Sequence, residues 1–447
     1  MWTSLEDEAA LLTQLQQTTA RVAVDVVGSS GQDRPIRLVR VGMPPPAATD
    51  RALLLHVGLQ HANEPAGREG LLRWIEHLAT TEDSAEQAFL AAHGVLIMPT
   101  ANPDGFVTMN RANAAGQDPN RQHIRLLAPE ALAISEVIRR ARPTIVVDHH
   151  EAAEFISPGI DIGVQPGQNP MIHPSVRSRA DDLTAAMLAR AAAESWTNEL
   201  YDFPFNEDER LLHNAGSLRY GAGVLIETRR TDDSQSGQEH RVDMHYAMAE
   251  EALAYAIAHE SDLISDADGA AQDRIADGAA GTLPFDLRTE VIDPPPLGYR
   301  MSGADFAATV TARASLGITA AGPVVPMAQA AYGVIPYLLD AASTSPLASA
   351  ARLFDLTPPA ELTVTDPAEL APIVSGSHRV RMEALVVPPG QAGSDPDGVE
   401  IPVLGGSVTW DGTADILGSV ELTTVARWPR ARERLLLPAG NEVFVRY

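Results

Sequence analysis

Three apolar segments of this chain each run directly into ionisable residues, and this pattern constrains the fold more than any other feature. The segments are LLHVGLQHANE at 54–64, TIVVDHHE at 144–151 and GVLIE at 223–227. Each resembles a strand that is buried on both faces of a sheet. In an open α/β sheet, ligands bind beyond the carboxyl ends of the strands, so loops after three different strands can form one site.

The segments between these strands predict helices. Pro65 stands where the first residue of a helix is expected, and Leu71, Ile75 and Leu78 then recur at the spacing of one buried stripe. Alternating strands and helices predict an α/β fold with a mixed, mostly parallel central sheet flanked by helices. Further helices are expected near 129–141, 181–195 and 243–259, a further strand at 94–99, and a hairpin at 21–27 and 34–41.

Changes in composition divide the chain into three parts. Residues 1–265 carry the alternating pattern and are expected to form one domain. Residues 266–282 are rich in Ala, Asp and Gly, and we expect a linker there. Residues 283–447 begin with strand and helix patterns and become β-rich from about residue 360, which predicts a smaller, β-rich C-terminal domain.

Two absences exclude whole classes of chemistry. The 447 residues include no cysteine, which excludes disulfides, thiolate metal ligands and cysteine nucleophiles. They also include no lysine, since all 33 basic residues are arginine, and this excludes Schiff-base chemistry and a P-loop lysine. A net charge of −26 argues against nucleic acid or an anionic membrane surface as a partner.

The sequence contains no run of 18 or more apolar residues, so no membrane span is predicted. The N-terminus, MWTSLEDEAALLTQLQQ, carries acids where a signal peptide carries bases. We therefore expect a cytoplasmic protein, with secretion as the alternative if a signal has been removed. The sequence does not indicate an oligomeric state.

The strand ends carry the ligand types of a zinc site. His61 and Glu64 follow the first strand, and Asp148-His149-His150 ends the second. Two imidazoles and one carboxylate are a common ligand set for catalytic zinc. Because side chains alternate along a strand, His149 and His150 face opposite sides, so only one of them is readily a ligand. Taken alone, the His-x-x-Glu pair also suits a solvated turn.

A hydrolase built on such a site needs a base beside the attacking water, and Glu227 at the third strand end could serve. The segment 99–123 carries Arg111 and the pair Asn120-Arg121. Arginine presents a planar fork that suits a carboxylate or a developing oxyanion. The alternative is that these arginines pair with the plentiful acids of the surface.

The set of motifs resembles the zinc carboxypeptidases of the M14 metallopeptidase family. The resemblance implies that His61, Glu64 and His150 bind one zinc ion per chain, because strands of this family place the ligand two residues after the aspartate. The matching pieces appear in the family's order over about residues 20–260 and are VVGSSGQDRPIRLVRVG, HANEPAG, NPDGF, NRANAAGQDPNR, VVDHHE and GVLIETR.

The same resemblance implies a zinc-dependent carboxypeptidase that hydrolyses the C-terminal peptide bond through a zinc-activated water. Glu227 would be the general base and Arg111 would polarise the scissile carbonyl. Asn120 and Arg121 would hold the terminal carboxylate of a peptide substrate.

Some features depart from the family pattern. The family's active-site tyrosine has no firm match, and Tyr201 and Tyr220 are the candidates. The residues around the Asn-Arg pair, DPNRQH, differ from the usual ones, and segment 201–222, which should shape the side-chain pocket, does not align.

Two alternatives stay open. One is an acyl-amino-acid amidohydrolase of the succinylglutamate desuccinylase and aspartoacylase type, which shares the zinc motif and the Asn-Arg pair but acts on a small acyl-amino acid. NPDGF and the ETR that follows the last strand favour the peptidase. The other is a catalytically inert metal-binding or interaction module, which would have no need of Glu227.

Overall fold

The computed structural model of this protein describes residues 2–45, 53–152, 156–230 and 232–356, together with the backbone of five short strands between residues 383 and 446. Its strands up to residue 356 are β1 (Val22–Ser29), β2 (Pro35–Val41), β3 (Leu54–Gly58), β4 (Val95–Met98), β5 (Ile145–Ala152), β6 (Ile162–Pro166), β7 (Asn198–Leu200), β8 (Ala222–Arg229), β9 (Phe285–Asp286), β10 (Val291–Ile292), β11 (Gly298–Arg300), β12 (Val324–Pro326) and β13 (Ala351–Leu353). Its helices are α1 (Leu5–Thr18), α2 (Ala66–Thr80), α3 (Ser84–Ala92), α4 (Pro103–Thr108), α5 (Pro129–Ala141), α6 (Pro174–Ala193), α7 (Leu212–Ser217), α8 (Gln235–Ala258), α9 (Glu260–Ala280), α10 (Gly303–Ala308), α11 (Val310–Ser315) and α12 (Ile335–Leu339), with 3₁₀ turns η1 (Pro119–Arg121) and η2 (Ala330–Gly333).

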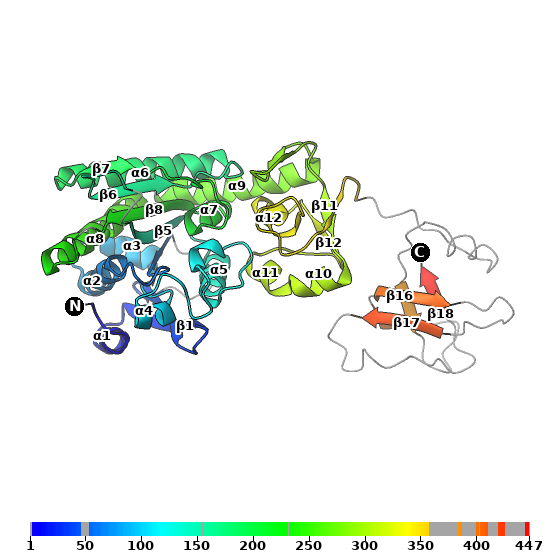
Figure 1. Cartoon of the computed structure of the whole chain (residues 1–447), viewed down its shortest axis with the longest axis horizontal. Helices are drawn as coiled ribbons and strands as arrows, with labels where there is room; N and C mark the ends of the chain where they lie inside the picture. Colours follow the sequence, from blue (N-terminus) through cyan, green and yellow to red (C-terminus); the bar gives the residue numbers. More distant parts are fainter. Residues whose placement is uncertain are drawn as a thin grey trace.

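Eight strands form one sheet in the order β1-β2-β4-β3-β5-β8-β6-β7. This sheet and its helices make up the part of the molecule coloured blue to green in Figure 1. The central strands β4, β3, β5 and β8 run parallel to one another, whereas the β1–β2 hairpin and β6 add antiparallel pairs on either side. The predicted mixed, mostly parallel sheet and the predicted hairpin are both confirmed.

Helices cover both faces of the sheet, because its central strands are apolar on both sides. On one face, α2, α6 and α8 pack over Val147 and Ile226. On the other face, α5 and α7 pack over Leu55 and Val146. Since successive side chains of a strand point to opposite faces, β5 sends its odd-numbered residues toward α2 and α8 and its even-numbered residues toward α5 and α7.

The segment predicted as a linker, 266–282, lies for the most part in helix α9. The predicted linker is thus helical over most of its length, and its role as a linker between domains stays a prediction. Leu263, Ala267 and Ala270 are buried and recur four and three residues apart, which is the spacing of one helix face. The stripe is narrow and made mostly of alanine, so the composition of the segment conceals it.

The part of the chain that follows α9 shares a hydrophobic core with the part that precedes it. Phe285, Tyr299 and Tyr337 pack in one cluster with Ile124 and Leu218. How the chain divides into domains stays a prediction. The shared core shows that the predicted boundary at residue 283 crosses a packed interior.

Beyond residue 356 the structure describes only strand backbones, and they agree with the predicted β-rich character. They form two small antiparallel sheets, in the orders β15-β14-β18 and β16-β17. Among the residues that the structure describes, no helix has the length and apolar character needed to cross a membrane. The strands are β14 (Glu383–Val386), β15 (Val399–Ile401), β16 (Val403–Thr409), β17 (Ser419–Thr424) and β18 (Val443–Arg446).

Gly67, in the first turn of α2, allows this helix to pack directly on β5. A Cβ atom at this position would lie 2.8 Å from the Cβ of His149 and 3.4 Å from its carbonyl oxygen. We expect Gly67→Ala to lower the free energy of unfolding by about 1–3 kcal/mol, because neither atom can move without the strand.

Gly269 offers a matched control, since it is also a helical glycine but a Cβ there would meet nothing within 4 Å. Gly269→Ala should raise the free energy of unfolding by about 0.5–1 kcal/mol through helix propensity. Urea unfolding of both variants measures the difference, and an unchanged or more stable Gly67→Ala protein would contradict the close packing of α2 on β5.

Candidate metal centre

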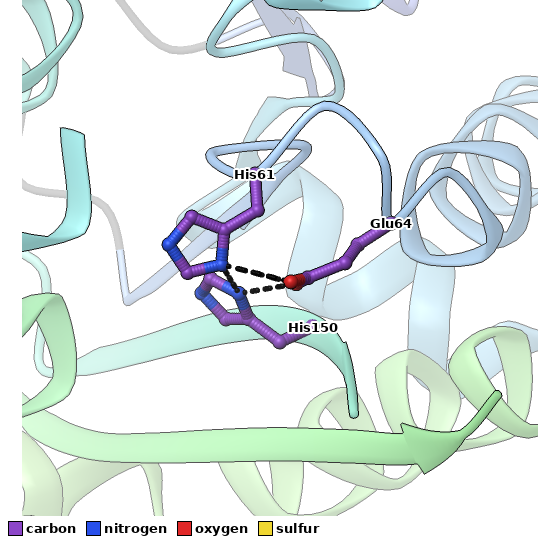
Figure 2. Close-up of side chains that lie close together, drawn as sticks. All are labelled: His61, Glu64 and His150. Carbon is purple, nitrogen blue, oxygen red and sulfur yellow. Dashed lines mark hydrogen bonds and ion pairs between the residues drawn. The ribbon is translucent and has the colours of Figure 1, made fainter. Parts of the chain in front are cut away.

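Three predicted ligands, His61, Glu64 and His150, come together at the carboxyl ends of β3 and β5. All three are buried, and one nitrogen or oxygen of each lies within 4.8 Å of the others. Figure 2 shows the two imidazoles and the carboxylate pointing to one place from the β3–α2 turn and from β5. Among the residues that the structure describes, no other group of three was found with this geometry.

The distances within this cluster define which atoms face the metal position. The Nδ1 atoms of His61 and His150 are 2.9 Å apart. The Glu64 carboxylate lies 3.1 Å from Nδ1 of His61 and 2.9 Å from Nδ1 of His150 (Figure 2). Two imidazole nitrogens and one carboxylate oxygen are a donor set that proteins use for catalytic zinc, so the three residues fit that ion.

Each of the two imidazoles also contacts a carboxylate through Nε2, the ring nitrogen that does not face Glu64. Asp118 Oδ1 lies 2.9 Å from Nε2 of His61, and Asp148 Oδ1 lies 2.8 Å from Nε2 of His150. A carboxylate in this position holds the ring proton on Nε2, which leaves Nδ1 free to bind a metal and fixes the orientation of the ring.

The charges in the cluster compensate one another. Burial alone would raise the pKa of the Glu64 carboxyl, but His61 and His150 hold that pKa far below its usual value. Burial alone would lower the pKa of His150, but Asp148 and Glu64 raise it well above its usual value. A cation therefore suits this position, since the carboxylates favour positive charge there.

His149 lies on the other face of β5, as strand alternation requires. Its Nε2 is 3.1 Å from Nδ1 of His56, and its Nδ1 is 3.1 Å from Nδ1 of His245. The far nitrogen of His245 meets the hydroxyl of Thr228 at 3.1 Å. Burial lowers the pKa of His149 to about 3, so this row of imidazoles is neutral and serves the packing of β3, β5 and α8.

Glu227 stands beside His150 because of the pairing between β5 and β8. In the parallel register of these strands, His150 and Glu227 are direct neighbours, and their side chains point to the same face. Although Glu227 keeps some exposure, its Oε2 is shielded from solvent and has no hydrogen-bond partner. Burial raises the pKa of the Glu227 carboxyl to about 8, against the opposing positive charge of His150.

Glu151, the other acid at the end of β5, has a structural role. Its Oε1 accepts a hydrogen bond from the backbone N–H of Ala66 at 2.7 Å, and its Oε2 pairs with Arg241 at 2.6 Å. Both charged side chains of this pair are buried. The carboxylate therefore anchors the start of α2 and is not free to act as a base.

Arg111 reaches the cluster from the loop after α4. Its guanidinium lies 3.2 Å from Glu64 Oε1 and 3.0 Å from Asp118 Oδ2, while its side chain stays 45% exposed. An arginine that touches a metal ligand and is open to solvent is placed to contact a substrate at the metal.

Asn120 and Arg121 take different positions although they are adjacent. The amide nitrogen of Asn120 lies 3.0 Å from both Asp148 Oδ2 and His150 Nε2, and its oxygen accepts from the N–H of Leu212 at 2.8 Å. Both ends of this amide are thus occupied, because its N–H donates to Asp148, which holds the Nε2 proton of His150, and its oxygen accepts from Leu212. The contact of Asn120 with a substrate carboxylate stays a prediction.

Arg121 is half-buried and donates to the carbonyl oxygen of Asn120 at 2.8 Å. Over the described part of the chain, no carboxylate lies within ion-pair distance of its guanidinium, although its positive charge helps to lower the pKa of Asp118. A cation near the metal position without an acidic partner is suited to bind an anionic group of a ligand.

The two candidate tyrosines differ in the groups that surround them. Tyr220 donates a hydrogen bond to the carbonyl of Ala330 and packs beside the second core cluster. Tyr201 is buried, and burial together with the charges of Glu227 and Glu64 raises its pKa far above the usual value. Tyr201 therefore lies in the electrostatic field of the site, and Tyr220 belongs to the packing.

Sequence reasoning missed three residues that support the cluster. Asp118 was not singled out, because its partner His61 lies 57 residues away in the sequence. Gln60 donates to Asp148 Oδ1 at 2.7 Å, and His123 lies 2.7 Å from the oxygen of Gln60. No local pattern marks Gln60 or His123, because their partners are distant in sequence.

A buried cluster of two histidines and one glutamate at the strand ends of an α/β sheet defines a protein with a catalytic-type zinc site. A family model described as zinc carboxypeptidase (Peptidase_M14) matches residues 9–259, more than half of the chain. The chain belongs to this family.

Relatives from fungi match part of this chain. The chain is 30% identical over 177 residues to carboxypeptidase 2 of Trichophyton tonsurans, a match that covers 36% of this chain and 33% of that protein. It is 28% identical over 227 residues to probable carboxypeptidase 2 of Trichophyton verrucosum, covering 45% and 44% of the two chains. The chain thus spans less than half the length of these relatives.

Solved structures include similar chains at lower identity. A metallo-carboxypeptidase from Burkholderia cenocepacia is 20% identical with a TM-score of 0.49, and the match covers 58% of this chain and 70% of that one. A metallo-carboxypeptidase from Pseudomonas aeruginosa is 21% identical with a TM-score of 0.48, covering 59% and 70%. The fold described above rests on the strand pairings of this chain and not on these similarities.

The opposite faces of His149 and His150 make a direct test of the metal centre. We expect the native protein to bind about one zinc ion per chain, and His150→Ala to lose most of it, because one ligand of three is removed. His149→Ala is the matched control and should keep the zinc, since its ring faces His56 and His245. Metal analysis after dialysis measures both, and the reverse result would place the ligand on the other face of β5.

Proposed function

We propose that this protein is a zinc-dependent carboxypeptidase that hydrolyses the C-terminal peptide bond of peptides. The observation that carries this proposal is the position of Glu227, a carboxylate beside His150 whose Oε2 is shielded and has no hydrogen-bond partner. An inert metal-binding module has no use for such a group, whose burial without a partner is costly.

The chemistry divides between the ion and the protein. Zinc at such a site supplies a Lewis acid that makes water nucleophilic near neutral pH and polarises a carbonyl. Glu227 takes the proton from the attacking water and delivers it to the leaving amine. Burial raises the pKa of the Glu227 carboxyl, and its Oε2 has no hydrogen-bond partner, which suits a group that accepts and then donates a proton.

The arginines supply the substrate contacts of this proposal. Arg111 lies against Glu64 and Asp118, where it can stabilise the oxyanion that forms from the scissile carbonyl. Arg121 can hold the terminal carboxylate with both nitrogens of its fork. The net charge of −26 would otherwise repel an anionic substrate, so a local cation is required.

Because both ends of the Asn120 amide are occupied, we assign most of the terminal-carboxylate contact to Arg121, whereas the family pattern implied both residues. Membership of the zinc carboxypeptidase family favours a peptide over a small acyl-amino acid as the substrate. Both substrate classes end in a free carboxylate, so direct assays on each are needed to separate them.

Glu227→Gln tests the base. We expect the variant to keep its zinc and to lose about 10²–10⁴-fold in turnover, because the amide cannot accept the proton. Glu199→Gln, which removes a carboxylate from the nearby strand β7, serves as the control and should keep its activity. Turnover of a free-acid peptide and the zinc content measure the outcome, and near-normal turnover of Glu227→Gln would assign the base to another group.

A C-terminally amidated peptide tests the substrate contact. The native enzyme should cut the free acid well and the amide poorly. Arg121→Ala should lose about 30- to several-thousand-fold in kcat/KM on the free acid, because removing one partner of a desolvated charge pair costs about 2–5 kcal/mol. In this variant, the ratio of kcat/KM for the free acid to kcat/KM for the amide should be smaller than in the native enzyme.

Arg37→Ala, a change of the same type in the β2 strand, is the control for this experiment and should leave the preference intact. If the native enzyme cuts amidated and free peptides equally well, the exopeptidase proposal fails in favour of an endopeptidase or amidase. Hydrolysis of acyl-amino acids alone would support the amidohydrolase.

A further inference from the structure

Glu209 carries a fully buried carboxylate in the loop between β7 and α7. Its Oε2 accepts a hydrogen bond from Nε of Arg288 at 2.8 Å and lies 2.6 Å from Nη2 of the same guanidinium as an ion pair. Its Oε1 accepts from the hydroxyls of Thr344 at 2.5 Å and Ser345 at 2.6 Å. These three partner residues all come from the part of the chain that follows α9 and lies outside the match to the carboxypeptidase family.

This arrangement ties the loop to the later segment. A buried carboxylate is stable only when its partners are in place, and the loss of one partner leaves an uncompensated charge. Arg288 also lies 3.4 Å from Asp208, whose carboxylate holds the guanidinium of Arg210 at 2.6 Å. Asp208 and Glu209 of this loop therefore both make ionic contacts with Arg288 of the later segment.

The loop in turn reaches the metal centre. Three residues after Glu209, the N–H of Leu212 donates to the Asn120 oxygen at 2.8 Å. The nitrogen of the same amide lies 3.0 Å from Nε2 of His150. The N–H of His123 meets the carbonyl of Arg210 at 3.4 Å. A continuous set of contacts thus joins the partners of Glu209 to one face of the site.

The segment that holds Glu209 is itself fixed in place. The hydroxyl of Tyr337 lies 3.1 Å from Oδ1 of Asn169 in the loop after β6. Arg274 of α9 donates to the carbonyl of Met171 at 3.1 Å. Together with the shared core around Phe285, these contacts give Arg288 and the two hydroxyls a rigid support.

We propose that Glu209 is a positioning residue through which residues 288–345 set the substrate side of the metal centre. The cluster acts on the loop 208–212, which carries Arg210 and meets Asn120, and it touches neither the substrate nor the metal. The inference rests on the proposed carboxypeptidase function for its kinetic consequence. Its structural consequence can be measured without activity.

Asp340 provides a matched control for Glu209. It is also a buried carboxylate of the same part of the molecule, paired with Arg352 at 2.7 Å and with the hydroxyl of Tyr299 at 2.8 Å, but it has no contact with the loop. Glu209→Gln should lower kcat/KM for a free-acid peptide by about 10- to 100-fold, mainly by raising KM, while zinc is retained. Asp340→Asn should lower the melting temperature but leave KM unchanged.

Two variants that each remove a single hydroxyl keep the test valid if the carboxylate variants do not fold. Ser345→Ala removes one donor to Glu209 and keeps the ion pair with Arg288. Thr309→Val removes another buried hydroxyl of the later segment, one that donates to the carbonyl of Asp305 and accepts from Nε of Arg313. Ser345→Ala should raise KM several-fold relative to Thr309→Val.

Hydrogen exchange separates this inference from the proposed function. Among the native protein and the four variants, amides of residues 208–214 should exchange faster in Glu209→Gln and Ser345→Ala only. If these variants match their controls in both KM and exchange, the inference is wrong. If the native protein cuts no peptide but the exchange difference appears, the carboxypeptidase proposal fails and the hold of this segment on the loop stands.

Discussion

The parallel pairing of β5 with β8 is the interaction on which the rest of the site depends. Its register places His150 opposite Glu227, so a metal ligand and a carboxylate of raised pKa become neighbours on one face. If the register slipped by one residue, His149 would lie on the face that carries Glu227, and His150 would lie on the opposite face, which packs against α2 and α8. The dense apolar contacts on both faces of the sheet make such a slip costly.

Charge compensation explains why the cluster at these strand ends tolerates burial. Each ligand histidine has a carboxylate behind it, Asp118 for His61 and Asp148 for His150. Glu64 faces both imidazoles, so its negative charge is also balanced. Glu227 is the exception, since its shielded oxygen has no partner, and a group left in that state at a metal position is a candidate for proton transfer.

The region matched by the family is not self-contained in this chain. Its second core cluster includes residues from beyond α9, and the buried carboxylate of Glu209 has all its donors there. The elements that carry His61, Glu64 and His150 pack within the first 260 residues. The loop 208–212 is instead held by contacts with residues 288–345, so the later segment contributes to the arrangement of the site.

The sequence by itself determined the layers of the fold and the face opposition of His149 and His150, because apolar runs and the alternation of a strand are local properties. It also placed His61 and Glu64 at a strand-to-helix turn. The resemblance to a family, and not the spacing, selected His150 over His149. Only the tertiary structure decided that Asn120 is engaged by Leu212 and Asp148, that most of 266–282 is helical, and that Glu209 is held by Arg288. Each of these depends on partners far away along the chain, and no local pattern of residues specifies such a partner.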